Sequence, residues 1–180
     1  PASKSFDPQA ILSSIEKHRV TNMFGAPTMI KLLVDSPAIS QFDHSSLKAI
    51  VYGGAPMLVE DLTRAIKCFG PCLVQLYGQG ESPMTISYLP HEDHVLNGTN
   101  KQMKRLASAG IAHTDVEIAI VDSQDRQLPT GERGEIVTRS DLVMKGYWQN
   151  PEATAKTLRN GWLHTGDVGY LDEENGRAHD

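Results

Sequence analysis

Residues 49–56, Ala-Ile-Val-Tyr-Gly-Gly-Ala-Pro, join an apolar stretch directly to a glycine-rich turn. A short apolar run that is bounded by Gly-Gly is typical of a buried strand. The spacing of apolar residues in 58–69 then predicts a helix that ends at Gly70. The side chains expected to face inward are Leu58, Leu62, Ile66 and Phe69. A strand followed by a turn and a helix is the repeating unit of a parallel sheet.

The same alternation extends to both sides of this unit. Asp7-Pro8 predicts the start of a helix that continues to about His18, and residues 20–24 predict a short strand before a helix that begins at Pro27. Residues 72–77 predict another strand, which stops at the turn 78–81. We therefore expect an α/β part with a parallel sheet and flanking helices over residues 1–108.

The pattern changes after this part to the two-residue period of half-exposed strands. Apolar residues alternate with other residues over 116–120, and the turn 129–131 leads to a return strand over 135–138. Asn150-Pro151 predicts a short helix, and residues 162–170 are strand-like. We therefore expect a mostly β part over residues 109–180.

The composition restricts the classes of function. The 180 residues are 39% hydrophobic and carry a formal net charge of -5 with no basic stripe, which argues against disorder and against a nucleic-acid partner. No apolar run reaches the ~20 residues that a membrane span requires. The first twenty residues also lack the order of a targeting signal. We expect a cytoplasmic protein.

Two glycine-rich turns follow predicted parallel strands, and ligands bind beyond the carboxyl ends of such strands. At the first turn, Gly53, Gly54 and Ala55 leave the backbone open to a flat ring. An ordinary tight turn between strand and helix is the alternative. At the second turn, Tyr77 offers an aromatic face and Glu81 a carboxylate for a hard divalent cation. The alternative is a charge at a helix start.

Two further polar stretches contain candidate ligands. Asp167 follows Thr165-Gly166, and a carboxylate that accepts two hydroxyl protons commonly binds a ribose, although a simple turn aspartate is the alternative. The stretch 91–94, His-Glu-Asp-His, has poor spacing for a metal site, and we expect a solvated loop there.

Four motifs together resemble those of a known family. They are residues 49–56, residues 76–81 (Leu-Tyr-Gly-Gln-Gly-Glu), residues 131–136 with 146–148, and residues 165–167. In order and spacing they are similar to the adenylate-forming, AMP-binding superfamily, in its branch of acyl-CoA synthetases and fatty-acid-CoA ligases. The resemblance implies an incomplete acetyl-CoA synthetase-like fold, in which a barrel-like, mostly β subdomain follows the α/β part.

The resemblance also implies a reaction and its participants. A carboxylate attacks MgATP to give an acyl adenylate and pyrophosphate, and CoA then takes the acyl group, so the expected cofactors and partners are ATP, Mg²⁺, CoA and a small carboxylic acid. Glu81 is implied as the magnesium ligand and catalytic residue. The implied nucleotide-binding residues are Gly53, Gly54 and Ala55 along the adenine, Gln75 near its edge, Tyr77 stacked on it, Gly78 and Gly80 in the same turn as Tyr77, and Asp167 at the ribose. The implied acyl-site residues are Phe24, Ser82 and Met84, for which ordinary core packing is the alternative.

The chain departs from the family pattern in two ways. Gly80 stands where the family usually has threonine, and no Ser/Thr/Gly-rich loop ending in Pro-Lys occurs in the sequence. We therefore expect an internal piece of the large N-terminal domain of a longer enzyme, inactive and self-associating when alone. A peptide-synthetase-type adenylation domain and a non-catalytic nucleotide-binding module remain the alternatives.

Overall fold

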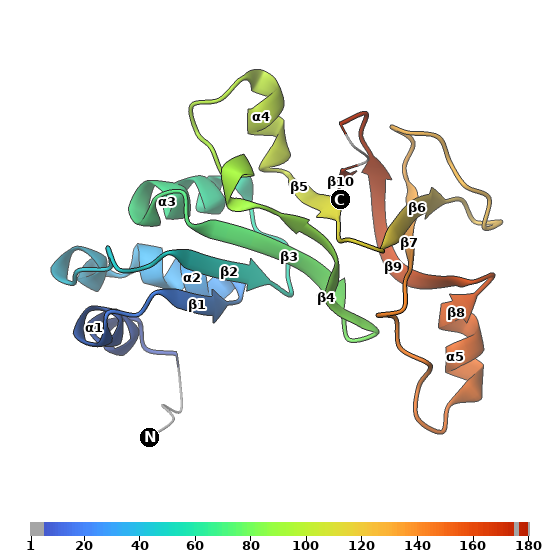
Figure 1. Ribbon diagram of the computed structural model, residues 1–180, viewed down its shortest axis with the longest axis horizontal. Helices are drawn as coiled ribbons and strands as arrows, with labels where there is room; N and C mark the ends of the chain where they lie inside the picture. Colours follow the sequence, from blue (N-terminus) through green and yellow to red (C-terminus); the bar gives the residue numbers. More distant parts are fainter. Residues whose placement is uncertain (1–5, 175–176, 180) are drawn as a thin grey trace. The chain divides into compact units, whose positions relative to one another are not determined.

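The structure, a computed structural model, describes residues 6–174 and 177–179 (Figure 1). Within them the chain is a mixed α/β protein whose ten-stranded sheet has the order β1-β2-β3-β4-β5-β10-β9-β7-β6, with β8 paired to β9. The chain divides into two compact units. The first unit comprises Pro1–Gln75 and Pro90–Ala107, and the second comprises Leu76–Leu89 and Ser108–Asp180. The units interleave in sequence, whereas a linear domain boundary at 108/109 stays a prediction.

The first unit contains the predicted alternation of strands and helices. Strands β1 and β2 pair in parallel, with Asn22 opposite Ala49. The bounds of its elements are α1 Pro8–His18, β1 Asn22–Gly25, α2 Pro27–Asp35, η1 Pro37–Gln41, β2 Ala49–Gly53, α3 Val59–Phe69, the start of β3 Leu73–Gln79, η2 His91–Asp93 and α4 Asn100–Arg105. In Figure 1 the arrows of β1, β2 and β3 point the same way.

Local chemistry sets the ends of these helices. The Asp7 side chain accepts hydrogen bonds from the backbone of Gln9 and Ala10, which confirms the predicted start of α1. Helix α3 begins at Val59, so the inward orientation predicted for Leu58 is wrong. Leu58 is the extended residue before the helix and is 71% exposed, because it lies outside the helical repeat that buries Leu62.

One apolar cluster forms the core of the first unit. It joins the inner faces of the helices to the strands and includes Leu106, just after α4. The cluster explains why the segment Pro90–Ala107 belongs with the earlier residues. Its most buried members, all at 0% or 1% exposure, are Leu12, Ile30, Leu33, Ile50, Tyr52, Leu62 and Leu73.

The stretch 91–94 is not the solvated loop that the sequence predicts. His94 is 0% exposed and Asp93 is 6% exposed. Arg105 Nη1 donates to Asp93 Oδ1 across 2.7 Å, and an acidic side chain rarely becomes buried without such a partner. The polar composition of this stretch therefore concealed two buried side chains.

The second unit is built mainly from antiparallel strands. Its antiparallel neighbours are β4 and β5, β5 and β10, β10 and β9, β9 and β7, and β7 and β6. The bounds of its elements are the end of β3, β4 Ser82–Leu89, β5 Ser108–Ala112, β6 Glu117–Val121, β7 Gly134–Arg139, α5 Pro151–Thr157, β8 Leu158–Arg159, β9 Trp162–Leu171 and β10 Ala178–His179. The strands β5 to β10 lie in the part that the sequence predicts to be mostly β, and the strand order does not confirm a barrel-like closure.

Strand β4 is the main element that the sequence did not predict. It follows β3 after the two residues Gly80 and Glu81, where the sequence indicates only the end of a strand. Separately, none of the helices in the part of the chain that the structure describes has the length and apolar character needed to cross a membrane.

We predict that Leu33→Ala destabilises the protein much more than Leu32→Ala does. Leu33 is 0% exposed in the core, whereas the adjacent Leu32 on the same helix is 49% exposed. Loss of a buried leucine side chain typically costs about 2–5 kcal/mol of unfolding free energy. Urea denaturation of the two variants measures the difference. Equal losses would show that α2 does not pack as described.

Candidate functional site

The first glycine-rich turn follows β2 in the first unit. Gly53 is buried at the end of the strand, while Gly54 and Ala55 are exposed in the turn. Gly54 has a φ of 83°, a conformation that favours glycine. Gln75 is half-buried on the neighbouring strand β3, with its Oε1 3.3 Å from Tyr52 Oη. The turn thus follows the end of β2, and Gln75 lies within the neighbouring strand β3.

The second turn, in the second unit, connects β3 to β4. A Cβ added at Gly78 would lie 2.4 Å from both the Met84 nitrogen and the Ser82 oxygen, so the two strands approach too closely for any side chain there. Met84 itself has a φ of 57°. In contrast, a Cβ added at Gly80 would meet no atom within 4 Å. The first glycine is required by packing, and the second is not.

The Thr165-Gly166-Asp167 motif forms a bulge in β9. Glu135 pairs with Val168 and Val137 pairs with His164, so the three motif residues lie opposite the single residue Ile136. Bulges of this kind direct side chains away from the ladder and are frequent beside functional sites. The sequence indicated an irregular residue here only through Gly166, which has a φ of 77°.

Hydrogen bonds from β7 fix the shape of this bulge. Thr165 Oγ1 donates to the Ile136 carbonyl across 2.7 Å, and the Gly166 nitrogen donates to Glu135 Oε1 across 3.0 Å. Glu135 Oε2 lies 2.8 Å from Nδ1 of the buried His164. The motif at 131–136 therefore contributes the carboxylate that supports the motif at 165–167.

The second turn and the bulge converge on one carboxylate. Tyr77 Oη donates to Asp167 Oδ2 across 2.6 Å, and Gln79 Nε2 donates to the same oxygen across 3.1 Å. Gln79 Nε2 also reaches the Thr165 carbonyl at 2.7 Å. Within the described residues, Asp167 Oδ1 accepts no hydrogen bond. One oxygen is therefore held by the protein, and the other can accept a hydroxyl proton from a ligand.

Glu81 is held from a different part of the same unit. The Tyr147 hydroxyl donates to Glu81 Oε1, and the Met144 nitrogen donates to the Glu81 carbonyl across 2.8 Å. The hydrogen bond to the carboxylate raises the pKa of Tyr147 above its usual value. The sequence motifs alone indicated no function for Tyr147, Gln79 or Thr165. All three lie inside the quoted motifs, so their positions were indicated but their contacts were not.

The predicted acyl-site residues make no hydrogen bond to Asp167 or Glu81 within the described residues. Phe24 is 56% exposed on β1, where it pairs with Val51. Ser82 is buried at the start of β4, and its hydroxyl lies 2.8 Å from Thr85 Oγ1. An acyl site formed by Phe24, Ser82 and Met84 stays a prediction.

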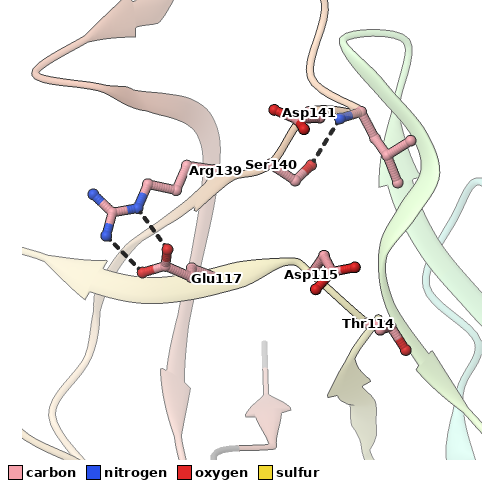
Figure 2. Close-up of a pocket in the computed structure, with 7 residues that line it drawn as sticks. Thr114, Asp115, Glu117, Arg139, Ser140 and Asp141 are labelled. Carbon is pink, nitrogen blue, oxygen red and sulfur yellow. Dashed lines mark hydrogen bonds and ion pairs between the residues drawn. The ribbon is translucent and has the colours of Figure 1, made fainter.

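A hollow of about 570 Å³ lies elsewhere in the second unit (Figure 2). Arg139 donates two hydrogen bonds to Glu117 at its wall, across 2.9 and 2.7 Å. The residues that line it are Thr114, Asp115, Glu117, Arg139, Ser140, Asp141 and Leu142. None of the predicted site residues is among them, and the cation at its wall is already paired. We exclude this hollow from the candidate site.

Comparison with known proteins identifies the family. Residues 1–148 match the model of the AMP-binding enzyme family, and the chain belongs to this family. The chain is 38% identical to the medium/long-chain-fatty-acid-CoA ligase FadD8 of Mycobacterium tuberculosis, over 94% of this chain and 28% of that protein. It is 38% identical to a feruloyl-CoA synthase of Amycolatopsis sp, over 93% of this chain and 32% of that protein.

A solved structure shows the same fold. The amide bond synthetase McbA from Marinactinospora thermotolerans matches with a TM-score of 0.85 and 38% sequence identity, over 98% of this chain and 35% of that one. The chain thus spans about a third of the length of the proteins it matches.

We predict that Gly78→Ala and Gly80→Ala differ sharply in stability. Alanine at position 78 forces a backbone clash, and overpacking typically costs about 1–3 kcal/mol. Alanine at position 80 meets open space and has no left-handed backbone to strain, so its melting temperature should stay close to that of the unmodified protein. Thermal denaturation followed by circular dichroism gives both values. A destabilised Gly80→Ala with an unaffected Gly78→Ala would contradict the described hairpin.

Proposed function

We propose that the chain is the nucleotide-binding part of an acyl-CoA synthetase, which activates a carboxylic acid as acyl-AMP and transfers it to CoA. The observation that carries the proposal is the carboxylate of Asp167, with Oδ2 held by Tyr77 and Gln79 and Oδ1 left to accept. A carboxylate fixed in this way is suited to the hydroxyls of a ribose. Membership of the AMP-binding family supports the same ligand.

We assign the rest of the nucleotide to other residues of the quoted motifs. In the proposal, the Tyr77 ring stacks on the adenine, and the backbone of Gly53, Gly54 and Ala55 lies along it. Gln75 meets the edge of the base. Gly80 leaves room for the phosphates at the turn before Glu81, since no atom lies within 4 Å of a Cβ added there. Gly78 contributes to the nucleotide site through its backbone, because the close approach of β3 and β4 leaves no space for a side chain at that position.

A magnesium ion fits Glu81. Glu81 Oε1 accepts from Tyr147, and its other oxygen has no hydrogen-bond partner within the described residues. No group of three His, Cys, Asp or Glu residues that could hold a metal occurs in residues 6–174 and 177–179. A single carboxylate is nevertheless suited to Mg²⁺, which usually keeps several waters and binds substrate phosphates. Bound there with ATP, the ion would neutralise charge on the phosphate oxygens.

In the adenylation step, the residues of this chain bind and orient the nucleotide. Asp167 would hold the ribose, and Glu81 would hold a magnesium ion that binds the phosphates. The substrate carboxylate can then attack the α-phosphorus, and pyrophosphate leaves. Tyr147 keeps Glu81 in one orientation by its hydrogen bond. Preorganised contacts of this kind lower the barrier because they need no rearrangement as charge develops.

The acid and the acceptor belong to the proposal. The curated relatives named above act, by their names, as a fatty-acid-CoA ligase and a feruloyl-CoA synthase, and they support CoA as the acceptor. An amine acceptor is a second candidate, because McbA is named as an amide bond synthetase. We propose that Phe24, Ser82 and Met84 contribute to the acyl site, and that the 180 residues alone are inactive.

The experiment uses the parent protein, by which we mean the full-length protein that carries this sequence. We predict pyrophosphate release with ATP, magnesium and a suitable acid from a panel of short, medium, long and aromatic acids.

Glu81→Gln should mainly lower kcat, because the negative charge that the magnesium ion would stabilise grows as pyrophosphate leaves. Asp167→Asn should mainly raise the KM for ATP, by about 10- to 150-fold for the loss of a charge-assisted hydrogen bond.

Asp141→Asn is the matched control, because Asp141 is exposed and lies outside the candidate site. Its kcat and KM should equal those of the parent. Supplying CoA or an amine after the adenylation step identifies the acceptor. If Glu81→Gln and Asp167→Asn both behave like Asp141→Asn, the assignment of the site is wrong.

A further inference from the structure

A chain of polar side chains crosses the core of the first unit and ends at Gln75. Tyr52 and His94 are both 0% exposed, and the His94 ring stands edge-on to the Tyr52 ring with a centroid distance of 5.7 Å. Tyr52 Oη lies 3.0 Å from His94 Nε2 and 3.3 Å from Gln75 Oε1. His94 Nδ1 lies 2.8 Å from the Pro90 carbonyl. Nothing in the proposed reaction uses Tyr52 or His94.

The number of hydrogens restricts how these groups can bond. The Pro90 carbonyl only accepts, so His94 Nδ1 carries a hydrogen. A neutral imidazole then has a lone pair on Nε2, which accepts the single hydrogen of the Tyr52 hydroxyl. The Tyr52 hydroxyl then has no second hydrogen to give to Gln75, and its oxygen can only accept there. The group of Gln75 that faces Tyr52 must therefore be a donor. Gln75 therefore directs its amide NH₂ group at Tyr52. This orientation places the amide nitrogen where Oε1 lies at 3.3 Å from Tyr52 Oη, and a half-turn about the Cγ–Cδ bond of Gln75 exchanges these two groups of similar size.

The opposite amide orientation requires a charged histidine. If Gln75 accepted the Tyr52 hydrogen, His94 would have to carry hydrogens on both nitrogens. An imidazolium at 0% exposure is costly, and the nearest carboxylate in the sequence, Asp93, already accepts from Arg105. Burial also lowers the pKa of His94. With a neutral histidine, each of the hydrogen-bonding groups that link Pro90, His94, Tyr52 and Gln75 has a matching donor or acceptor.

We propose that Tyr52 and His94 are positioning residues that hold the Gln75 amide with its carbonyl oxygen outward, and so select a nucleobase with an exocyclic amino group. An outward oxygen accepts from the amino group of adenine but meets only another acceptor on a base with a carbonyl at that position, such as hypoxanthine. The inference rests on the proposed function, because it takes Gln75 to lie at the edge of the base.

The location of Gln75 agrees with this selection. Strands β2 and β3 are hydrogen-bonded neighbours, with the Ile50 nitrogen donating to the Cys72 carbonyl across 2.7 Å. Tyr52 is the residue directly before Gly53 near the end of β2. The side chain that orients Gln75 is therefore adjacent in sequence to the turn that we assign to the base. Gln75 is half-buried, which leaves part of its amide accessible to a ligand.

The test compares binding of ATP and inosine triphosphate to the parent protein by calorimetry, using Tyr52→Phe and His94→Phe. Tyr52→Phe releases the amide to turn either way, so the preference for ATP should fall by about three- to tenfold, as expected for one hydrogen bond. His94→Phe keeps an aromatic ring against Tyr52 but removes the acceptor. The Tyr52 hydrogen then passes to Gln75, the NH₂ group faces outward, and the preference for ATP should fall further than in Tyr52→Phe.

Ser46→Ala is the matched control, because it also removes a hydroxyl hydrogen bond in the first unit, from Ser46 Oγ to the Val20 carbonyl across 2.8 Å. It should leave the ratio of the two dissociation constants unchanged. A folded Tyr52→Phe or His94→Phe with the parental ratio overturns the inference, since a merely structural change weakens both nucleotides alike. If one variant fails to fold, the other decides. The two proposals can fail separately. If the ratio of the two dissociation constants shifts in the variants, but the parent releases no pyrophosphate with any acid, the proposed function is refuted and the inference stays supported.

Discussion

The hydrogen bond from Tyr77 to Asp167 is the contact on which the candidate site depends. It joins residues that are 90 positions apart in sequence, and at 2.6 Å it has the length of a hydroxyl donating to a charged carboxylate. Without it, the second glycine-rich turn and the bulge of β9 would be two separate irregularities in the same unit. With it, an aromatic ring and a carboxylate are joined directly, as the proposed nucleotide site requires. The Gln79 amide reinforces this contact by bonding to both Asp167 and Thr165.

Backbone constraints on either side keep these groups in place. Gly78 allows β3 and β4 to approach so closely that no side chain fits, and the turn before Glu81 is consequently tight. On the other side, Glu135 bonds to the Gly166 nitrogen and faces the buried His164. The site therefore requires glycine at one strand and a carboxylate at the other. Both requirements are visible as motifs in the sequence, because each is a property of one residue type.

The sequence predicted what local chemistry determines and missed what distant contacts determine. Asp7-Pro8 marked the start of α1 because capping needs only adjacent residues. Strand β4 was missed because its pairing with β5 involves residues far along the chain. The burial of His94 was missed for the same reason, since its partner Tyr52 lies 42 residues away. For the site, the motifs indicated Tyr77 and Asp167 separately, but only the structure shows that they bond. The contact between Tyr147 and Glu81 was likewise not predictable from spacing.

The central claim is that Asp167 and Glu81 hold the two ends of one nucleotide. The most direct measurement is a crystal structure of the parent protein with ATP and magnesium. The account predicts the ribose hydroxyls on Asp167 Oδ1, the base against the Tyr77 ring, and the metal between Glu81 and the phosphates. A nucleotide bound elsewhere, with Tyr77 and Gln79 still closed on an Asp167 that touches no ligand, would contradict it.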